Sequence, residues 1–186
     1  MKFHVPLFLI PWFALISCAN PLAAEQYPLT RDALEKRYAE EVSAHRNYAA
    51  YSTQACSEGY PNIAHLFKAL STSEAIHAQN FKHLLSGLGG TDARTAPMPE
   101  NATRGTRHNL RHAADVERDE IDREYPDILA GIESENHAAA IKNITYAWQA
   151  EKQHRELIIK IQKAAGRWFG LLVKRIEGEP THYHVC

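Results

Sequence analysis

Two stretches of the chain carry the same pattern, in which apolar residues recur at steps that alternate between four and three. This spacing places side chains on one face of a helix, so each stretch predicts a helix with a buried face. The first stripe comprises Ile63, Phe67, Leu70, Glu74, His77, Phe81 and Leu84. The second comprises Ala140, Ile144, Ala147, Glu151, His154, Ile158 and Ile161. In both stripes a Glu-x-x-His pair takes the two central positions.

A carboxylate at the centre of an apolar face needs a positive partner. Moving an unpaired carboxylate out of water costs several kcal/mol even after relaxation, roughly the net stability of a small domain. A metal ion is the simplest partner, because a Glu oxygen and a His nitrogen three residues apart on a helix point toward a common centre. The pattern therefore predicts metal binding as well as helices.

Two further helices are predicted, which makes an all-α fold of four helices over residues 30–58, 61–86, 107–134 and 136–165. Thr30 is the expected N-cap of the first helix, and Gly59 its stop. Pro126 should kink the third helix or mark an irregularity in it. Residues 91–106, rich in Pro, Thr, Ala and Asn, predict a long surface loop that crosses between the second and third helices.

The two halves of the chain repeat one arrangement of acidic residues. Glu41 precedes Glu74 by 33 residues, and Glu117 precedes Glu151 by 34, with Glu120 one turn beyond Glu117. Each half thus supplies a lone Glu and then a Glu-x-x-His pair, which is the donor set of ferritin-like dimetal carboxylate bundles. The candidate metal ligands are Glu41, Glu74, His77, Glu117, Glu120, Glu151 and His154. Oxygen-rich sites with one imidazole per metal suit two non-haem iron ions, with manganese or a mixed pair left open.

The first 24 residues predict an export signal. Lys2 precedes an apolar run over residues 3–16, which is too short to span a bilayer and fits a secretory signal. Two cleavage sites remain open: a lipobox-like sequence ending at Cys18, where the mature protein would carry a lipid anchor, or a site after Ala24. The expected location is the periplasm or, as a lipoprotein, the membrane of a bacterial envelope.

Composition limits the remaining chain to one globular domain, expected over residues 28–166. A formal net charge of −1 argues against a nucleic-acid surface. After the leader only Cys56 and Cys186 remain, which excludes a disulfide framework. Residues 167–186 are expected to form a C-terminal tail.

Short motifs from both halves resemble the rubrerythrin family over most of residues 33–165. The first half carries EVSAHRNY over residues 41–48, Glu58-Gly59-Tyr60 and Glu74-x-x-His77-Ala78. The second half carries Thr106-x-x-Asn109-Leu110, Glu117-x-x-Glu120-x-x-x-x-Tyr125-Pro126 and Ala150-Glu151-x-x-His154. The resemblance implies that Glu74 and Glu151 bridge two metals, that Glu41 and Glu117 bind terminally, and that His154 holds one iron permanently.

The resemblance also assigns catalytic roles. His77 and Glu120 would be alternative ligands of the other iron, which in this family moves between them as its oxidation state changes. The hydroxyls of Tyr48 and Tyr125 would bond the ligand carboxylates and fix their geometry.

The implied activity is a peroxidase that reduces hydrogen peroxide to water and protects against oxidative stress. A homodimer is implied as well. One departure concerns electron supply: Tyr183-His184-Val185-Cys186 looks like the start of the family's rubredoxin-like domain, but one Cys cannot supply a tetrathiolate iron site. The tail is therefore interpreted as a remnant of that domain, and electrons are expected from an external redox protein such as a rubredoxin-like carrier. Two alternatives stay open: a ferroxidase or metal-binding ferritin-like protein without peroxidase turnover, and a structural bundle without metal.

Overall fold

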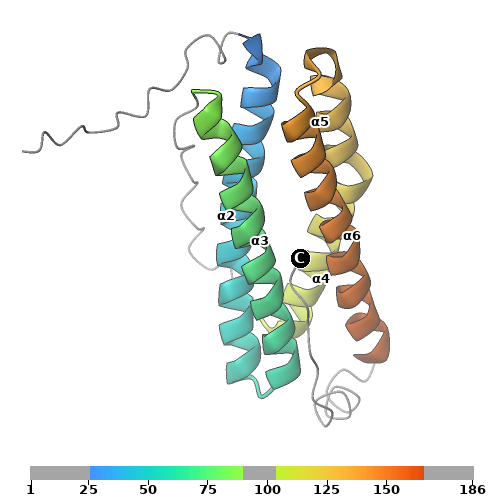
Figure 1. The fold of residues 1–186 in the computed structure, drawn as a ribbon. Coiled ribbons are helices and arrows are strands. Elements are labelled where there is room, and N and C mark those ends of the chain that lie inside the picture. The colour runs from blue at the N-terminus through green and yellow to red at the C-terminus, as the bar shows by residue number, and fades with distance from the viewer. Residues whose placement is uncertain (1–25, 90–103, 166–186) are drawn as a thin grey trace, which may run out of the picture.

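The computed structural model describes residues 26–89 and 104–165, which form a four-helix bundle (Figure 1). Its helices are α2 (Pro28–Ser57), α3 (Pro61–Gly87), α4 (Thr106–Asp119), α5 (Tyr125–Ile132) and α6 (Ala138–Ala165). A π-helical turn, η1 (Glu120–Glu124), joins α4 and α5 into one continuous helix, and a 3₁₀ turn, η2 (Glu133–Glu135), precedes α6. The predicted all-α ferritin-like class is confirmed. The predicted export signal, the tail over 167–186 and most of the loop lie outside the described residues.

The direction of the helices shows how the chain crosses the bundle. α2 and α3 form an antiparallel pair, whereas α3 and the α4–α5 helix run in the same direction (Figure 1). α3 ends at one end of the bundle, and α4 begins at the other. This arrangement confirms the predicted crossover between the second and third helices.

Two helix starts are capped by carboxylates from distant parts of the chain. Glu135 accepts hydrogen bonds from the backbone N–H groups of Leu29 (2.8 Å) and Thr30 (2.7 Å) at the start of α2. Glu58 accepts one from the N–H of Thr106 (3.0 Å) at the start of α4. The prediction of Thr30 as N-cap was wrong, because α2 begins at Pro28 and the remote Glu135 satisfies its free N–H groups.

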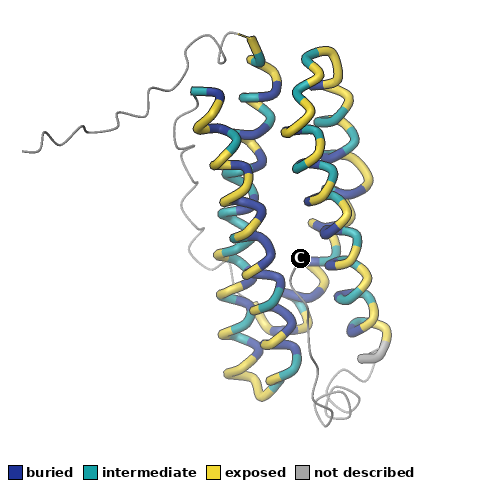
Figure 2. The backbone as a smooth tube through the Cα atoms, viewed as in Figure 1, coloured by how far each residue is buried: buried dark blue, intermediate teal, exposed yellow. Residues whose placement is uncertain are grey.

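The core lies in two apolar clusters on either side of a polar layer. One cluster includes Tyr48, Phe67 and Ile158, and the other includes Leu34 and Phe81. Each fully buried large apolar side chain stabilises the fold by roughly 1.5–3 kcal/mol. Figure 2 shows the buried positions facing inward along all the helices. Within the described residues, no helix is both long enough and apolar enough to cross a membrane.

Candidate metal centre

The π turn sets the orientation of the third helix at the site. Tyr125 donates its N–H to the carbonyl of Glu120, five residues back, and Pro126 has no N–H to continue the pattern. The carbonyl of Ile121 instead accepts the indole N–H of Trp148 at 3.0 Å. The π turn holds one extra residue, so the eight residues from Glu117 to Tyr125 cover the rotation of seven α-helical residues. The side chains of Glu117 and Tyr125 therefore point about 20° apart around the helix axis, instead of about 80°. Both side chains thus face the bundle interior, and the irregularity predicted at Pro126 is confirmed.

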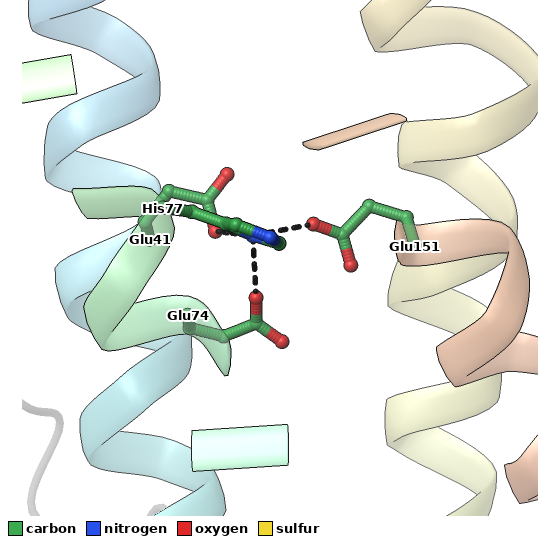
Figure 3. Close-up of side chains that lie close together, drawn as sticks. All are labelled: Glu41, Glu74, His77 and Glu151. Carbon is green, nitrogen blue, oxygen red and sulfur yellow. Dashed lines mark ion pairs between the residues drawn. The ribbon is translucent and has the colours of Figure 1, made fainter. Parts of the chain in front are cut away.

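Six of the seven predicted ligands converge in the polar layer. Their donor atoms form two groups, and within each group the atoms lie within 4.8 Å of one another. The first group comprises Glu41, Glu74, His77 and Glu151, drawn in Figure 3, and the second comprises Glu74, Glu117, Glu151 and His154. All six residues are buried, none more than 7% exposed. Because Glu74 and Glu151 belong to both groups, the arrangement offers two adjacent metal positions that share two carboxylates.

The two groups have matching contacts around their imidazoles. In the first, Nδ1 of His77 lies 3.1 Å from Glu74 Oε2, 3.3 Å from Glu151 Oε1 and 3.7 Å from Glu41 Oε2 (Figure 3). In the second, Nδ1 of His154 lies 2.8 Å from Glu151 Oε2 and 3.1 Å from Glu74 Oε1. The two rings are nearly parallel, with an interplanar angle of 22° and centroids 6.1 Å apart. Each imidazole therefore faces both shared carboxylates.

These contacts control protonation when no metal is bound. Burial alone would lower the pKa of His77, but the carboxylates around it, with Glu151 and Glu41 foremost, raise it to about 12. Burial would also lower the pKa of His154, but the negative charges of Glu74 and Glu151 outweigh it and raise that pKa well above its usual value. Burial and the charge of Glu151 also raise the pKa of Glu117. Without metal, the cluster therefore holds positive charge as protons on its two imidazoles.

Unsatisfied polar atoms indicate that the cluster fits metal ions. Within the described residues, both carboxylate oxygens of Glu74, Oε2 of Glu117 and Nδ1 of His77 are buried without a partner of hydrogen-bonding geometry. Such atoms are costly to bury unless something satisfies them. Two divalent ions would balance the four carboxylates of the two groups, and the mixed oxygen and nitrogen donors suit iron or manganese.

Glu120, the seventh predicted ligand, is not in either group. Its Oε1 accepts a hydrogen bond from Nη2 of Arg37 at 3.1 Å, and its side chain is 15% exposed. The structure thus places His77 inside the first group and Glu120 beside it. The exchange of these two ligands stays a prediction.

The two predicted tyrosines contact carboxylates of the cluster. Tyr48 donates a hydrogen bond to Glu117 Oε1 at 2.6 Å. Tyr125 donates to Glu41 Oε1 at 2.9 Å and lies 3.3 Å from Glu151 Oε1. Each hydroxyl therefore restrains a carboxylate whose other oxygen is free to face the cluster.

Arg37 is a residue of the site that sequence reasoning missed. Its side chain is fully buried, and Nη2 lies 2.8 Å from Glu41 Oε1. The signal was present: Arg37 follows Leu34 by three residues and precedes Glu41 by four, so it lies on the inward stripe of α2. His45 follows Glu41 by one helical turn but does not join the cluster. Its Nδ1 lies 2.7 Å from the carbonyl oxygen of Ser71.

A bundle of four helices with two carboxylate-rich groups that share ligands defines a ferritin-like protein with a candidate dimetal centre. The sequence model of the rubrerythrin family matches residues 32–161. The chain therefore belongs to the rubrerythrin family, and the resemblance seen in its motifs is confirmed.

Individual relatives agree with this assignment. The chain is 33% identical to Rubrerythrin-2 of Clostridium acetobutylicum over 140 residues, which cover 74% of each protein. It is similar to a fully reduced, all-ferrous structure of nigerythrin, with a TM-score of 0.68 and 27% identity over 81% of this chain and 69% of that one. A bacterioferritin of Desulfovibrio desulfuricans matches with a TM-score of 0.76 over 88% of this chain and 95% of that one, at 18% identity, and supports the fold alone.

Proposed function

We propose that the protein is a non-haem di-iron peroxidase, which reduces hydrogen peroxide to water with electrons from a separate redox protein. The observation that carries this proposal is the pair of buried donor groups that share Glu74 and Glu151, in a chain of the rubrerythrin family. Two iron ions would be held by the first group through Glu41 and His77, and by the second through Glu117 and His154, with both shared carboxylates between them.

Two bound ferrous ions would supply one electron each, so that the O–O bond of hydrogen peroxide breaks and two protons complete two water molecules. The protein must hold its donors in place while the charge at the centre changes. Tyr48 and Tyr125 do so through their hydrogen bonds to Glu117 and Glu41. The apolar clusters on either side exclude bulk water, which strengthens each electrostatic contact in the layer between them.

A surface cavity beside the cluster is the proposed route for a small oxidant. It has a volume of about 430 Å³ and opens between α2 and α4. Tyr48 and Glu120 form part of its lining, together with Glu40 and Glu124. Because Glu120 borders both the cavity and the first donor group, it is placed to act where peroxide would arrive. His77 lies inside the first group, and in this proposal the two side chains exchange as ligands between the reduced and oxidised states.

The remaining features of the proposal concern the cellular setting. An exported or lipid-anchored protein would receive its electrons from an envelope redox carrier, such as a rubredoxin-like protein, and the family resemblance implies a homodimer. In this setting the activity would protect the envelope against peroxide.

The test is a comparison of oxidants on the reduced, iron-loaded protein. One equivalent of peroxide under anaerobic conditions should oxidise the centre much faster than air does. The optical spectrum of the centre follows the oxidation. Fast oxidation by air with sluggish peroxide turnover would instead identify a ferroxidase, and purified protein without stoichiometric iron or manganese would refute both. The variant His77→Ala should lose peroxide turnover, whereas His83→Ala, an exposed position on the same helix, should retain it.

A further inference from the structure

One buried arginine connects the metal cluster to the ligand that lies outside it. Arg37 is on α2, one turn before Glu41, and its side chain has no exposed surface. A single nitrogen, Nη2, donates to Glu41 Oε1 at 2.8 Å and to Glu120 Oε1 at 3.1 Å. These are charge-assisted hydrogen bonds in a buried setting, where they are stronger than on the surface. Arg37 therefore ties a carboxylate of the first donor group to Glu120.

Other contacts fix the position of the Arg37 side chain. Its guanidinium carbon lies 4.4 Å from the ring centroid of Tyr125, and Nη2 lies 3.3 Å from the hydroxyl of that tyrosine. On the other side, Nη1 donates to Glu40 at 2.9 Å and lies 3.5 Å from Glu124. The planar guanidinium is thus held from both edges and from one face, which leaves it little freedom to follow Glu120 if that side chain moves.

This contact has a consequence for the exchange of His77 and Glu120. In the described conformation His77 is in the first donor group, and the Glu120 carboxylate is hydrogen-bonded to Arg37. For Glu120 to join the group, its carboxylate must move toward the ions and away from the fixed guanidinium, which lengthens the hydrogen bond to Arg37. Arg37 therefore favours the arrangement in which His77, and not Glu120, is a ligand.

The charge of Arg37 acts in the same direction. With Glu120 included, five carboxylates and two ferrous ions leave one negative charge, which Arg37 offsets. Two ferric ions would leave one positive charge, to which Arg37 adds. Since Arg37 is always protonated, its field opposes oxidation of the centre.

We propose that Arg37 is a positioning residue that holds Glu120 away from the metal ions and thereby stabilises the reduced state of the centre. This inference rests on the proposed iron binding but not on peroxide turnover. If Arg37 were merely a counter-ion that keeps Glu41 buried, its effect on the reduction potential of the centre would not depend on Glu120.

The experiment measures the midpoint potential of the iron-loaded protein by optical redox titration, after iron stoichiometry has been checked. We expect Arg37→Met to lower the ratio of reduced to oxidised centre at a fixed potential at least tenfold, which is about 59 mV for a one-electron step. The matched control is Lys36→Met, which removes a neighbouring cation of α2 that contacts Glu124 at 3.2 Å but not Glu120. In Lys36→Met, the ratio of reduced to oxidised centre should stay within threefold of the wild-type ratio.

A second background separates positioning from simple charge. In Glu120→Gln protein, Arg37→Met should shift the potential by less than half as much, because the carboxylate that Arg37 restrains is gone. An unchanged potential in Arg37→Met, or an equal shift in both backgrounds, would overturn the proposal. If Arg37→Met does not fold, Arg37→Lys provides the same comparison, since a lysine keeps the charge but not the fixed fork. A wild-type potential in Arg37→Lys would also overturn it, whereas a wild-type protein that binds no iron would refute the proposed function itself.

Discussion

The hydroxyl of Tyr48 on α2 donates a 2.6 Å hydrogen bond to Glu117 on α4, 69 residues further along the chain. The other half of the bundle repeats this contact in reverse, because Tyr125 on α5 donates to Glu41 on α2 at 2.9 Å. Each half of the duplicated pattern thus supplies the tyrosine that restrains the lone Glu of the other half. The cluster is therefore held by contacts between the halves, and neither half could form it alone.

Replacement of Tyr48 by Phe should weaken both the fold and the metal site. Burial and the charge of Glu117 raise the pKa of Tyr48 well above its usual value, so its hydroxyl stays protonated and donates. Loss of the Tyr48 hydroxyl leaves both buried oxygens of Glu117 without a hydrogen bond, which should cost about 1–3 kcal/mol of unfolding free energy in the metal-free protein. Metal affinity should fall roughly 10–100-fold, as for other residues that orient ligands.

Chemical denaturation and metal titration would check this prediction. Tyr146→Phe is the control, because Tyr146 is 64% exposed and far less able to affect the core. Equal stability of Tyr48→Phe and wild type would show that the hydrogen bond contributes nothing net.

Metal binding should release protons. Without metal, the pKa of His77 is raised to about 12 and that of His154 lies well above its usual value, so both imidazoles are protonated at pH 7. A metal ligand must be a neutral imidazole, so filling both positions should release at least two protons, one from each ring. The combined affinity for two ions should then rise roughly 100-fold per pH unit near neutrality. Calorimetric titration with Mn²⁺ in two buffers of different ionisation enthalpy would measure the number released, and identical heats in both buffers would contradict the prediction.

The same groups predict how the stability of the metal-free protein depends on pH. The folded-state pKa of His77 lies above its usual 6.5, so its contribution is fully present below pH 6.5 and is lost as pH rises toward 12. Over that range the unfolding free energy should fall by up to about 1.4 kcal/mol per pH unit for each such imidazole. Burial opposes ionisation of Glu151, but the cation of His154 outweighs it and lowers the pKa of that carboxyl. The contribution of Glu151 to the unfolding free energy is therefore present above pH 4.5 and is lost in acid.

The raised pKa of Glu117 adds to the loss at high pH, so the metal-free protein should become steadily less stable from pH 6 toward pH 9. Metal-loaded protein should show no such alkaline loss, because its imidazoles are neutral ligands that require no proton. Melting temperatures of both forms at pH 6, 7.5 and 9 would test this, and parallel curves would argue that the imidazoles do not bind the metal.

The repeated stripes of α3 and α6 could be predicted almost completely from the sequence. Of their fourteen positions, only Leu84 is not buried in the structure. The reason is physical: a buried helical face depends on a local period, and both stripes keep that period for six turns without a break. The Glu-x-x-His pairs are at the centre of these faces, so the same period predicted that both pairs are buried.

Features that depend on distant pairing could not be predicted in this way. The cap of α2 comes from Glu135, which is 105 residues from Thr30, and no local rule selects it over Thr30 itself. The position of Glu120 depends on Arg37. The helical period places Arg37 on the inward stripe, but arginine is seldom fully buried, so the period alone does not show that this one is. A buried arginine becomes expected only once several carboxylates are known to surround it.

The π turn offers a last prediction, on the coupling between Pro126 and Trp148. Pro126 has no N–H for the carbonyl of Ile121, and the indole N–H of Trp148 takes its place at 3.0 Å. Trp148→Phe should leave this carbonyl without its donor and cost about 1–3 kcal/mol of unfolding free energy, in addition to the loss of packing. Pro126→Ala restores a backbone N–H in the same register, so Trp148→Phe should cost less in that background. Denaturation of the wild type, both single variants and the double variant gives the coupling energy, and strict additivity would show that the indole does not substitute for the missing backbone donor.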